Sequence, residues 1–414
     1  MSTQKDRSLP LSDPLDILLA DIAVRIQLSP SNYRKAVSRY ETINSYIERE
    51  DSPLYDHVEL FYPQGSMAIN ATIASRLTTD HHDIDIVAQL NLPENSAPRI
   101  PLDLLFQAIK GGPGSRYYSC TKRQTRCVTV EYADGMHIDI TPAVRRWDHP
   151  ERESMIFHHR PEEAENPGFH VISNPYGFAQ WFIQCLPRTV EFTEAYAELS
   201  KSYELAVFAE AQQDPVPDQE NLYQKPLDVI VLQLLKRFRN VRYDHRRGRR
   251  PPSIMLAKLI VDGSAPNGSL IDELHQQAVM IRQGFQETHF NNQLLAVRNP
   301  VCRDDIFTDR WPANLQEQQL FINDLNHFVD QLERLRSGCS LEEMRKIMGD
   351  LFGEQPALDV VTSYSEKLGH GIRQGSSLYV PGTGRVNPRS VAGTFLGAGS
   401  TAARSTPKHT FYGE

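Results

Sequence analysis

The most informative stretch of the sequence for the fold is YPQGSMAINATIASRLTTDHHDIDIVAQL, residues 62–90. A turn at Gly65 and Ser66 precedes a polar gap, after which Asp83 and Asp85 flank a single isoleucine in an apolar run. Side chains alternate across a strand, so the two aspartates share one face and the isoleucines the other. A carboxylate buried in a strand costs free energy unless a cation meets it. The stretch therefore predicts a strand with one core face and one face that binds a cation.

A second stretch, MHIDITPAV at residues 136–144, repeats this pattern. Alternation sends Met136, Ile138 and Ile140 to the core and puts Asp139 on the opposite face. If the two strands are neighbours in one sheet, three carboxylates converge and repel one another unless a divalent cation lies among them. Oxygen ligands alone select Mg²⁺ or Mn²⁺ over zinc. We therefore predict a two-metal phosphoryl-transfer site with Asp83, Asp85 and Asp139 as catalytic and metal-binding residues.

The Gly-Ser turn has a role in this scheme. Gly65 lets the backbone approach a phosphate closely, Ser66 offers an N–H and a hydroxyl, and Gln64 adds an amide donor. Taken alone, a D-x-D pair is common on loop edges and a Gly-Ser pair indicates even less. The combination with a third aspartate on a later strand of matching pattern is what makes the prediction specific. His81 and His82 precede the pair and are expected to be solvated rather than ligands.

Composition limits the remaining interpretations. The chain has 414 residues and a net charge of −8, which argues against a protein that coats nucleic acid, and nucleic acid is not an expected partner. No window approaches the ~18 apolar residues of a membrane span, so no membrane association is expected. The first residues lack the apolar core of a signal peptide, and a cytoplasmic location is expected. Five scattered cysteines indicate reduced thiols.

Periodicity along the chain predicts an α+β protein of several parts. Residues 1–57 show helical spacing, with Ser29 or Ser31 as a cap and Pro30 in a first turn. Strand-like alternation follows within 58–175, although the Pro- and His-rich part near 150–175 looks irregular. Helical periodicity returns within 176–368, and 369–414 has the composition of a flexible C-terminal tail. The default site is the cleft between the α/β lobe and the helical lobe.

At these residues the sequence resembles the DNA polymerase β-like nucleotidyltransferases and, within them, the cGAS/DncV-like nucleotidyltransferases (CD-NTases) of bacterial anti-phage CBASS systems. The resemblance rests on YPQGSMAINATI, DIDIVAQL and HIDITPAV, and on LQLLKRFRN, PSIMLAKLI and RNPVCRDDIFTDRW. It implies a nucleotidyltransferase lobe with a mixed sheet, a C-terminal helical lobe, and N-terminal helices that pack on both. It also implies that Gln64 and Ser66 contact the donor nucleotide and that Lys236 and Ser253 contact phosphate.

The resemblance also implies a function. Nucleoside triphosphates, ATP and also GTP, UTP or CTP, would be condensed into a cyclic di- or trinucleotide second messenger with release of pyrophosphate. A downstream effector would respond to the messenger alone. A ubiquitin-transfer-like ligation enzyme would be a partner of the C-terminal tail, although Glu414 follows Gly413 here where such tails often end in glycine.

Two other functions stay open at this stage. A linear oligonucleotide synthase or non-templated nucleotidyltransferase would use the same residues. A catalytically silent nucleotide-binding scaffold would keep the fold alone, and the complete set of three aspartates speaks against it.

The basic run from Arg239 to Arg250 could be a phosphate-attracting rim, an RNA contact or a solvated loop, and the solvated loop is favoured. Lys236 lies three residues before this run, beside an apolar stripe that includes Ile230 and Leu234. Such a position lets its ammonium reach the cleft.

Overall fold

The computed structural model describes residues 11, 13–74, 82–163, 165–187, 190–210, 224–264 and 269–374, and three short strands between 378 and 405. His81, Gly413 and Glu414 lie outside the described residues. None of the described helices is both long and apolar enough to cross a membrane. All five cysteines are free thiols, as predicted.

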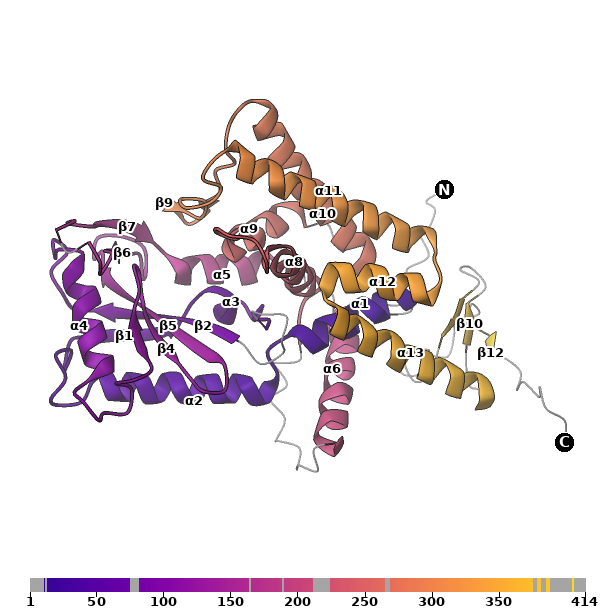
Figure 1. Ribbon diagram of the computed structural model, residues 1–414, viewed down its shortest axis with the longest axis horizontal. Coiled ribbons are helices and arrows are strands. Elements are labelled where there is room, and N and C mark those ends of the chain that lie inside the picture. Colours follow the sequence, from indigo (N-terminus) through magenta and orange to yellow (C-terminus); the bar gives the residue numbers. More distant parts are fainter. Residues whose placement is uncertain are drawn as a thin grey trace.

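A seven-stranded mixed sheet forms one lobe of the molecule (Figure 1). Its main path runs β1-β2-β5-β4-β3, and β6 and β7 continue the sheet from β5. Only β2 and β5 pair in parallel, whereas the other pairs are antiparallel. The strands are β1 (Val58–Pro63), β2 (His82–Leu90), β3 (Thr121–Arg123), β4 (Val128–Glu131), β5 (Met136–Arg145), β6 (Ser154–His158) and β7 (Phe169–Ser173).

One face of this sheet packs against two helices, α2 (Pro30–Ile47) and α4 (Arg99–Lys110). Ile84 and Ile86 of β2 and Ile138 and Ile140 of β5 are fully buried in that core. Burial of each such side chain contributes about 1.5–3 kcal/mol. Because the isoleucines are held on this face, the intervening aspartates must point to the other face.

The second lobe is helical and surrounds α8, which lies near the centre of Figure 1. All residues from Leu227 to Asn240 in α8 are buried, although the sequence predicted an amphipathic helix. The cause is contact with α1, α9, α10 and α12 on different sides. The helices of this lobe are α5 (Pro175–Cys185), α6 (Val190–Glu210), α8 (Leu227–Tyr243), α9 (Ser253–Gly263), α10 (Leu270–Phe290), α11 (Leu315–Ser337), α12 (Leu341–Phe352) and α13 (Glu354–Gln374), with α1 (Pro14–Ile26) packed among them.

Three regions differ from the sequence-based expectation. The stretch near 150–175 is not irregular, because β6 and β7 pair there as sheet strands. A hairpin of β8 (Arg298–Asn299) and β9 (Cys302–Ile306) lies beside β7. Helix α13 continues through 369–374, and β10 (Leu378–Val380), β11 (Arg385–Asn387) and β12 (Arg404–Ser405) form a small sheet. The other residues of the predicted tail lie outside the described part.

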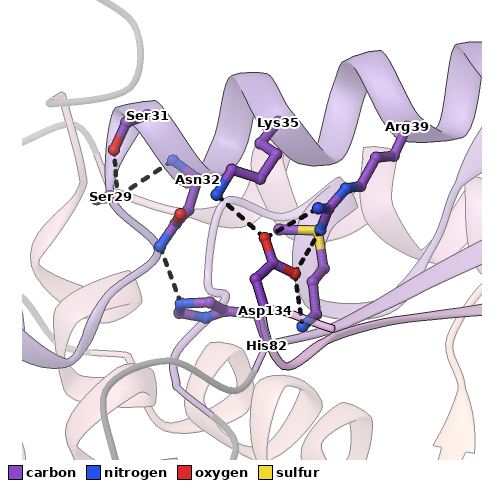
Figure 2. A network of polar contacts seen from close by, with 8 residues as sticks. Ser29, Ser31, Asn32, Lys35, Arg39, His82 and Asp134 are labelled. Carbon is purple, nitrogen blue, oxygen red and sulfur yellow. Dashed lines mark hydrogen bonds and ion pairs between the residues drawn. The ribbon is translucent and has the colours of Figure 1, made fainter. Parts of the chain in front are cut away.

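Helix α2 is tied to the starts of both β2 and β5 (Figure 2). Ser29 caps the helix by accepting a hydrogen bond from the backbone N–H of Asn32, as one of the two predicted caps. The Asn32 amide nitrogen lies 3.4 Å from Nε2 of His82. The prediction that His82 is solvated was wrong, because its side chain is buried. Asp134 precedes β5 and pairs with Lys35 at 3.1 Å and with Arg39 at 2.8 Å. These contacts fix the ends of the two strands that carry the aspartates.

We expect Asp134→Asn to lower the free energy of unfolding by about 1 kcal/mol at pH 7, since it removes two partly exposed ion pairs. Hydrogen bonds from Arg39 hold the pKa of Asp134 below its usual value. The contribution is therefore present above the unfolded-state pKa, about 4, and is lost as the pH falls toward the lower folded-state pKa. Chemical unfolding at pH 7 and pH 3 measures this difference, with Asp148→Asn as an exposed control. An equal difference at both pH values would contradict the assignment.

Candidate functional site

A cavity of about 770 Å³ lies between the sheet and the helical lobe. Its lining includes every site residue that the sequence singled out: Gln64, Gly65, Ser66, Asp83, Asp85, Asp139, Lys236 and Ser253. Residues more than 180 positions apart in the chain therefore meet at one place. The cavity also contains residues from the basic run and from the segment that follows β9.

The three aspartates come from the two strands that pair in parallel. Asp85 of β2 lies directly opposite Asp139 of β5, and Asp83 lies two residues earlier on the same face of β2. Burial, followed by the charges of Asp139 and Asp83, raises the pKa of Asp85 to about 7. Burial likewise raises the pKa of Asp139, whose Oδ1 accepts a hydrogen bond from the Thr129 hydroxyl at 2.5 Å. The site is therefore one where negative charge is crowded and costly.

The chemistry of these donors fits a hard divalent cation. They supply only oxygen, and a cation between them would relieve the repulsion that, after burial, helps to raise the pKa values of Asp85 and Asp139. Within the described ranges, however, no group of three or more His, Cys, Asp and Glu side chains already forms a metal-binding cluster. The three carboxylates nevertheless share one face of the sheet and line one cavity.

The Gly-Ser turn is fastened to β2 beside Asp85. The Gln64 backbone N–H donates to the Asp85 carbonyl oxygen at 2.8 Å, and its side-chain amide donates to the Thr141 hydroxyl at 3.2 Å. Gly65 begins the short helix α3 (Gly65–Ala68) with a positive φ of 57°. A Cβ at this position would lie 2.9 Å from Oδ2 of Asp85. Glycine is therefore required both by the backbone angle and by the carboxylate.

Lys236 reaches the cavity from the centre of the helical lobe. Its side chain is buried, and its Nζ donates to the Ala71 carbonyl oxygen at 2.6 Å. Burial lowers the pKa of Lys236 to about 7, with Arg239 adding to the effect. Lys236 thus contacts the segment that follows the Gly-Ser turn and links the two lobes.

Arg239 is a residue that the sequence interpretation missed. It is buried, and its Nη1 donates to the Ser253 hydroxyl at 2.8 Å and to the Pro251 carbonyl oxygen at 2.8 Å. Burial, followed by the charge of Arg250, lowers its pKa to about 9. A signal was present in the sequence, because Arg239 lies three positions after Lys236 and so on the same side of a helix.

The interpretation of residues 239–250 as a solvated loop was wrong in part. Arg246 pairs with Asp324 at 2.5 Å, whereas Arg249 and Arg250 are exposed but line the cavity. The opposite wall includes Asp304, Asp305, Phe307, Arg310 and Trp311, which follow or belong to the β8–β9 hairpin. The cavity therefore has acidic groups on the sheet and near the β8–β9 hairpin, together with several cations.

Comparison with known proteins gives a consistent family. The model of the Second Messenger Oligonucleotide or Dinucleotide Synthetase domain matches residues 16–185. The cyclic dinucleotide synthase CdnG of Bradyrhizobium diazoefficiens is 37% identical over 98% of this chain and 96% of its own length. The c-di-GMP synthase of Roseivirga ehrenbergii is 24% identical over 97% of both. The structure of the Bradyrhizobium diazoefficiens CdnG in complex with GTP is similar with a TM-score of 0.75 and 36% identity, covering 86% of this chain and 99% of that one.

We expect Asp83→Asn or Asp85→Asn to remove nucleotide transfer by several orders of magnitude while leaving the fold intact. Each change removes a charge that would bind a cation and also relieves like-charge repulsion, so stability should not fall. Pyrophosphate release and thermal unfolding measure the two effects. Asp148→Asn, on an exposed loop outside the cavity, is the matched control. Turnover that persists in both variants would refute the role given to these aspartates.

Gly65→Ala tests the turn. The added methyl group meets the Asp85 carboxylate and forces a non-glycine residue to a positive φ, so we expect at least a tenfold loss of turnover and lower stability, by about 1–2 kcal/mol for the backbone alone. The measurements are steady-state rates and chemical unfolding. Gly112→Ala is the control, because a Cβ there meets nothing within 4 Å. Unaltered rates in Gly65→Ala would show that the close approach is not needed.

Proposed function

Because the chain belongs to the cGAS/DncV-like nucleotidyltransferases, we propose that it condenses two nucleoside triphosphates, at least one of them GTP, into a cyclic dinucleotide. One pyrophosphate leaves in each of the two steps. The observation that carries the proposal is the meeting of Asp83, Asp85 and Asp139 with the Gly-Ser turn in one cavity.

Two features of the relatives support this choice of product. Two full-length relatives are named a cyclic dinucleotide synthase and a c-di-GMP synthase, which favours a ring of two nucleotides over three. The first of these, the CdnG of Bradyrhizobium diazoefficiens, was solved in complex with GTP, which favours guanine over the other bases for one substrate. The base of the second nucleotide is left to the product analysis below.

The residues of the cavity divide into groups that bind the donor and groups that bind metal. Gln64, Gly65 and Ser66 contact the donor triphosphate, and Lys236 and Ser253 contact its phosphates from the helical lobe. Arg239 holds the Ser253 hydroxyl in place through the hydrogen bond at 2.8 Å. This set combines backbone donors, hydroxyls and a point charge, as phosphate sites usually do.

Asp83, Asp85 and Asp139 hold two Mg²⁺ ions, with Mn²⁺ as a substitute. Members of this family are generally metal-dependent. When bound, these ions lower the pKa of the attacking hydroxyl and neutralise the leaving pyrophosphate. Thr129 fixes the orientation of Asp139 through its hydrogen bond. Asp139 would complete the metal site nearest the attacking hydroxyl of the second nucleotide, and the same residues would serve both the joining step and the ring closure.

A linear oligonucleotide synthase is the second candidate, since it needs the same donor and metal groups. The two functions differ in the ends of the product. A cyclic dinucleotide has no terminal phosphate, whereas a linear one keeps a 5′-triphosphate that phosphatase removes.

Product analysis tests the proposal. Incubation of the full chain with all four nucleoside triphosphates and Mg²⁺ is expected to give a guanine-containing dinucleotide that resists phosphatase. Liquid chromatography with mass spectrometry identifies its mass and base content, and the Asp85→Asn variant is the blank. A product that phosphatase degrades would favour the linear synthase, a ring of three would refute the dinucleotide, and no product would favour a silent scaffold.

We propose further that the chain acts in the cytoplasm within CBASS signalling, where an effector responds to the messenger. Family membership supports this, and the described residues carry no direct sign of it. Phage plating on cells that carry the chain with its neighbouring genes, against the same cells with Asp85→Asn, tests the proposal. Equal plating in the two strains would refute it.

A further inference from the structure

A second cavity of about 430 Å³ adjoins the first. The two share two lining residues, Arg249 of the basic run and Arg310, which follows the β8–β9 hairpin. The remaining lining comes from β6, β7 and the loop between them, together with Thr125. None of these residues belongs to the set that would contact the donor.

The shared arginines carry positive charge that no ion pair neutralises in the described part of the chain. The neighbouring Arg126 pairs with Asp309 at 2.5 Å, and Arg160 pairs with Glu163 at 2.7 Å. Neither Arg249 nor Arg310 has an ion pair or hydrogen bond within the described part of the chain. Burial, then the charges of Arg126 and Arg249, lowers the pKa of Arg310 to about 10. Like charges held this close cost free energy that a bound anion would recover.

The wall of the second cavity beside these arginines has one carboxylate, Glu163, which already pairs with Arg160. Arg126 Nε donates to His158 Nε2 at 2.7 Å, and burial followed by the nearby arginines lowers the pKa of His158 to about 3. The His158 ring stacks on Phe169 with 4.4 Å between ring centroids. At neutral pH the imidazole is therefore neutral and serves as an acceptor for Arg126. The charge of Asp309 also acts on Arg310, but the ion pair of Asp309 is with Arg126, so neither Arg249 nor Arg310 has an ion-pair partner in the described part of the chain.

The proposed function requires a second site that binds phosphate, apart from the donor's site. In the joining step two triphosphates occupy one cavity, and the donor's phosphates use the Gly-Ser turn, Lys236 and Ser253. The acceptor keeps its own 5′-triphosphate, which carries about four negative charges and must be kept apart from the acidic face of the sheet. Among the described residues that line the first cavity, Arg249 and Arg310 are the cations without an acid or hydrogen-bond partner.

We propose that Arg249 and Arg310 bind the 5′-triphosphate of the acceptor nucleotide at the junction of the two cavities. The proposal rests on the proposed function and assigns its second substrate a phosphate subsite. The linear intermediate keeps this triphosphate until it becomes the donor for ring closure. Release from the two arginines and transfer to the Gly-Ser turn then separates the two steps.

The test separates donor from acceptor chemically. The 2′,3′-dideoxy form of GTP or ATP serves as a donor that cannot accept, because it lacks both hydroxyls. The acceptor is guanosine or adenosine, either free or as its 5′-α,β-methylene triphosphate, which cannot donate because its α–β bond is not cleaved. The readout is kcat/KM for the linear dinucleotide with each acceptor, measured for the full chain with Mg²⁺.

We expect Arg249→Ala and Arg310→Ala each to lose at least tenfold more kcat/KM with the methylene triphosphate than with the free nucleoside, as loss of a charge-assisted contact implies. Arg310→Lys keeps the charge but lacks the planar guanidinium group, so its loss with the methylene triphosphate is expected to be smaller than that of Arg310→Ala. Arg247→Ala, on the same loop but outside both cavities, is the matched control, and thermal unfolding checks that each variant is folded.

Equal losses with both kinds of acceptor would overturn the proposal, since they would indicate recognition of the base. A rise in donor KM alone would also overturn it and place the arginines at the donor. Failure of the proposed function is distinguishable, because the unaltered chain would then form no dinucleotide with any acceptor.

Discussion

The parallel pairing of β2 with β5 is the constraint on which the site depends. It places Asp85 opposite Asp139, and the isoleucines on either side of each aspartate hold that register by their burial against α2 and α4. A slip of one residue would turn the carboxylates into the core and the isoleucines into the cavity. The contacts of α2 with His82 and Asp134 act on the same two strands at their first residues. Burial of the isoleucines therefore fixes the position of the three aspartates. The aspartates must lie on the cavity face of the sheet although their charges repel one another there.

The sheet and the aspartates could be predicted because their signal is local. Alternation of isoleucine and aspartate indicates which face of a strand is buried. Two strands with the same pattern are expected to pair in one sheet, because each then buries the same face. The strands β6 and β7 could not be predicted in this way, because their pattern is short and lies among prolines and histidines. The same holds for α8, whose burial on all sides follows from the helices around it and not from its own sequence. His82 was misjudged for a similar reason, since α2 covers it.

The residues of the helical lobe that line the cavity could be predicted only in part from the sequence. Lys236 and Ser253 were found through resemblance to a family, whereas Arg239 was read as part of a solvated run. The burial of Arg239 depends on the loop that follows α8. This loop folds back so that the Pro251 carbonyl oxygen accepts a hydrogen bond from the Arg239 guanidinium. A run of arginines in a sequence does not reveal which members face a cavity, which pair with a distant acid such as Asp324, and which stay unpaired.

The two walls of the cavity carry buried charges of opposite sign. On the sheet, burial and mutual repulsion raise the pKa of Asp85 to about 7. On the helical lobe, burial lowers the pKa values of Lys236 and Arg239 to about 7 and 9. The two sets could cancel by direct contact, yet Lys236 donates to the Ala71 carbonyl oxygen and Arg239 to Ser253. In the function proposed above, the phosphates of a nucleoside triphosphate would meet the helical lobe and its divalent cations would meet the aspartates, so this ligand would satisfy both walls together. The buried charges are thus held apart at a cost in free energy that binding of such a ligand would recover.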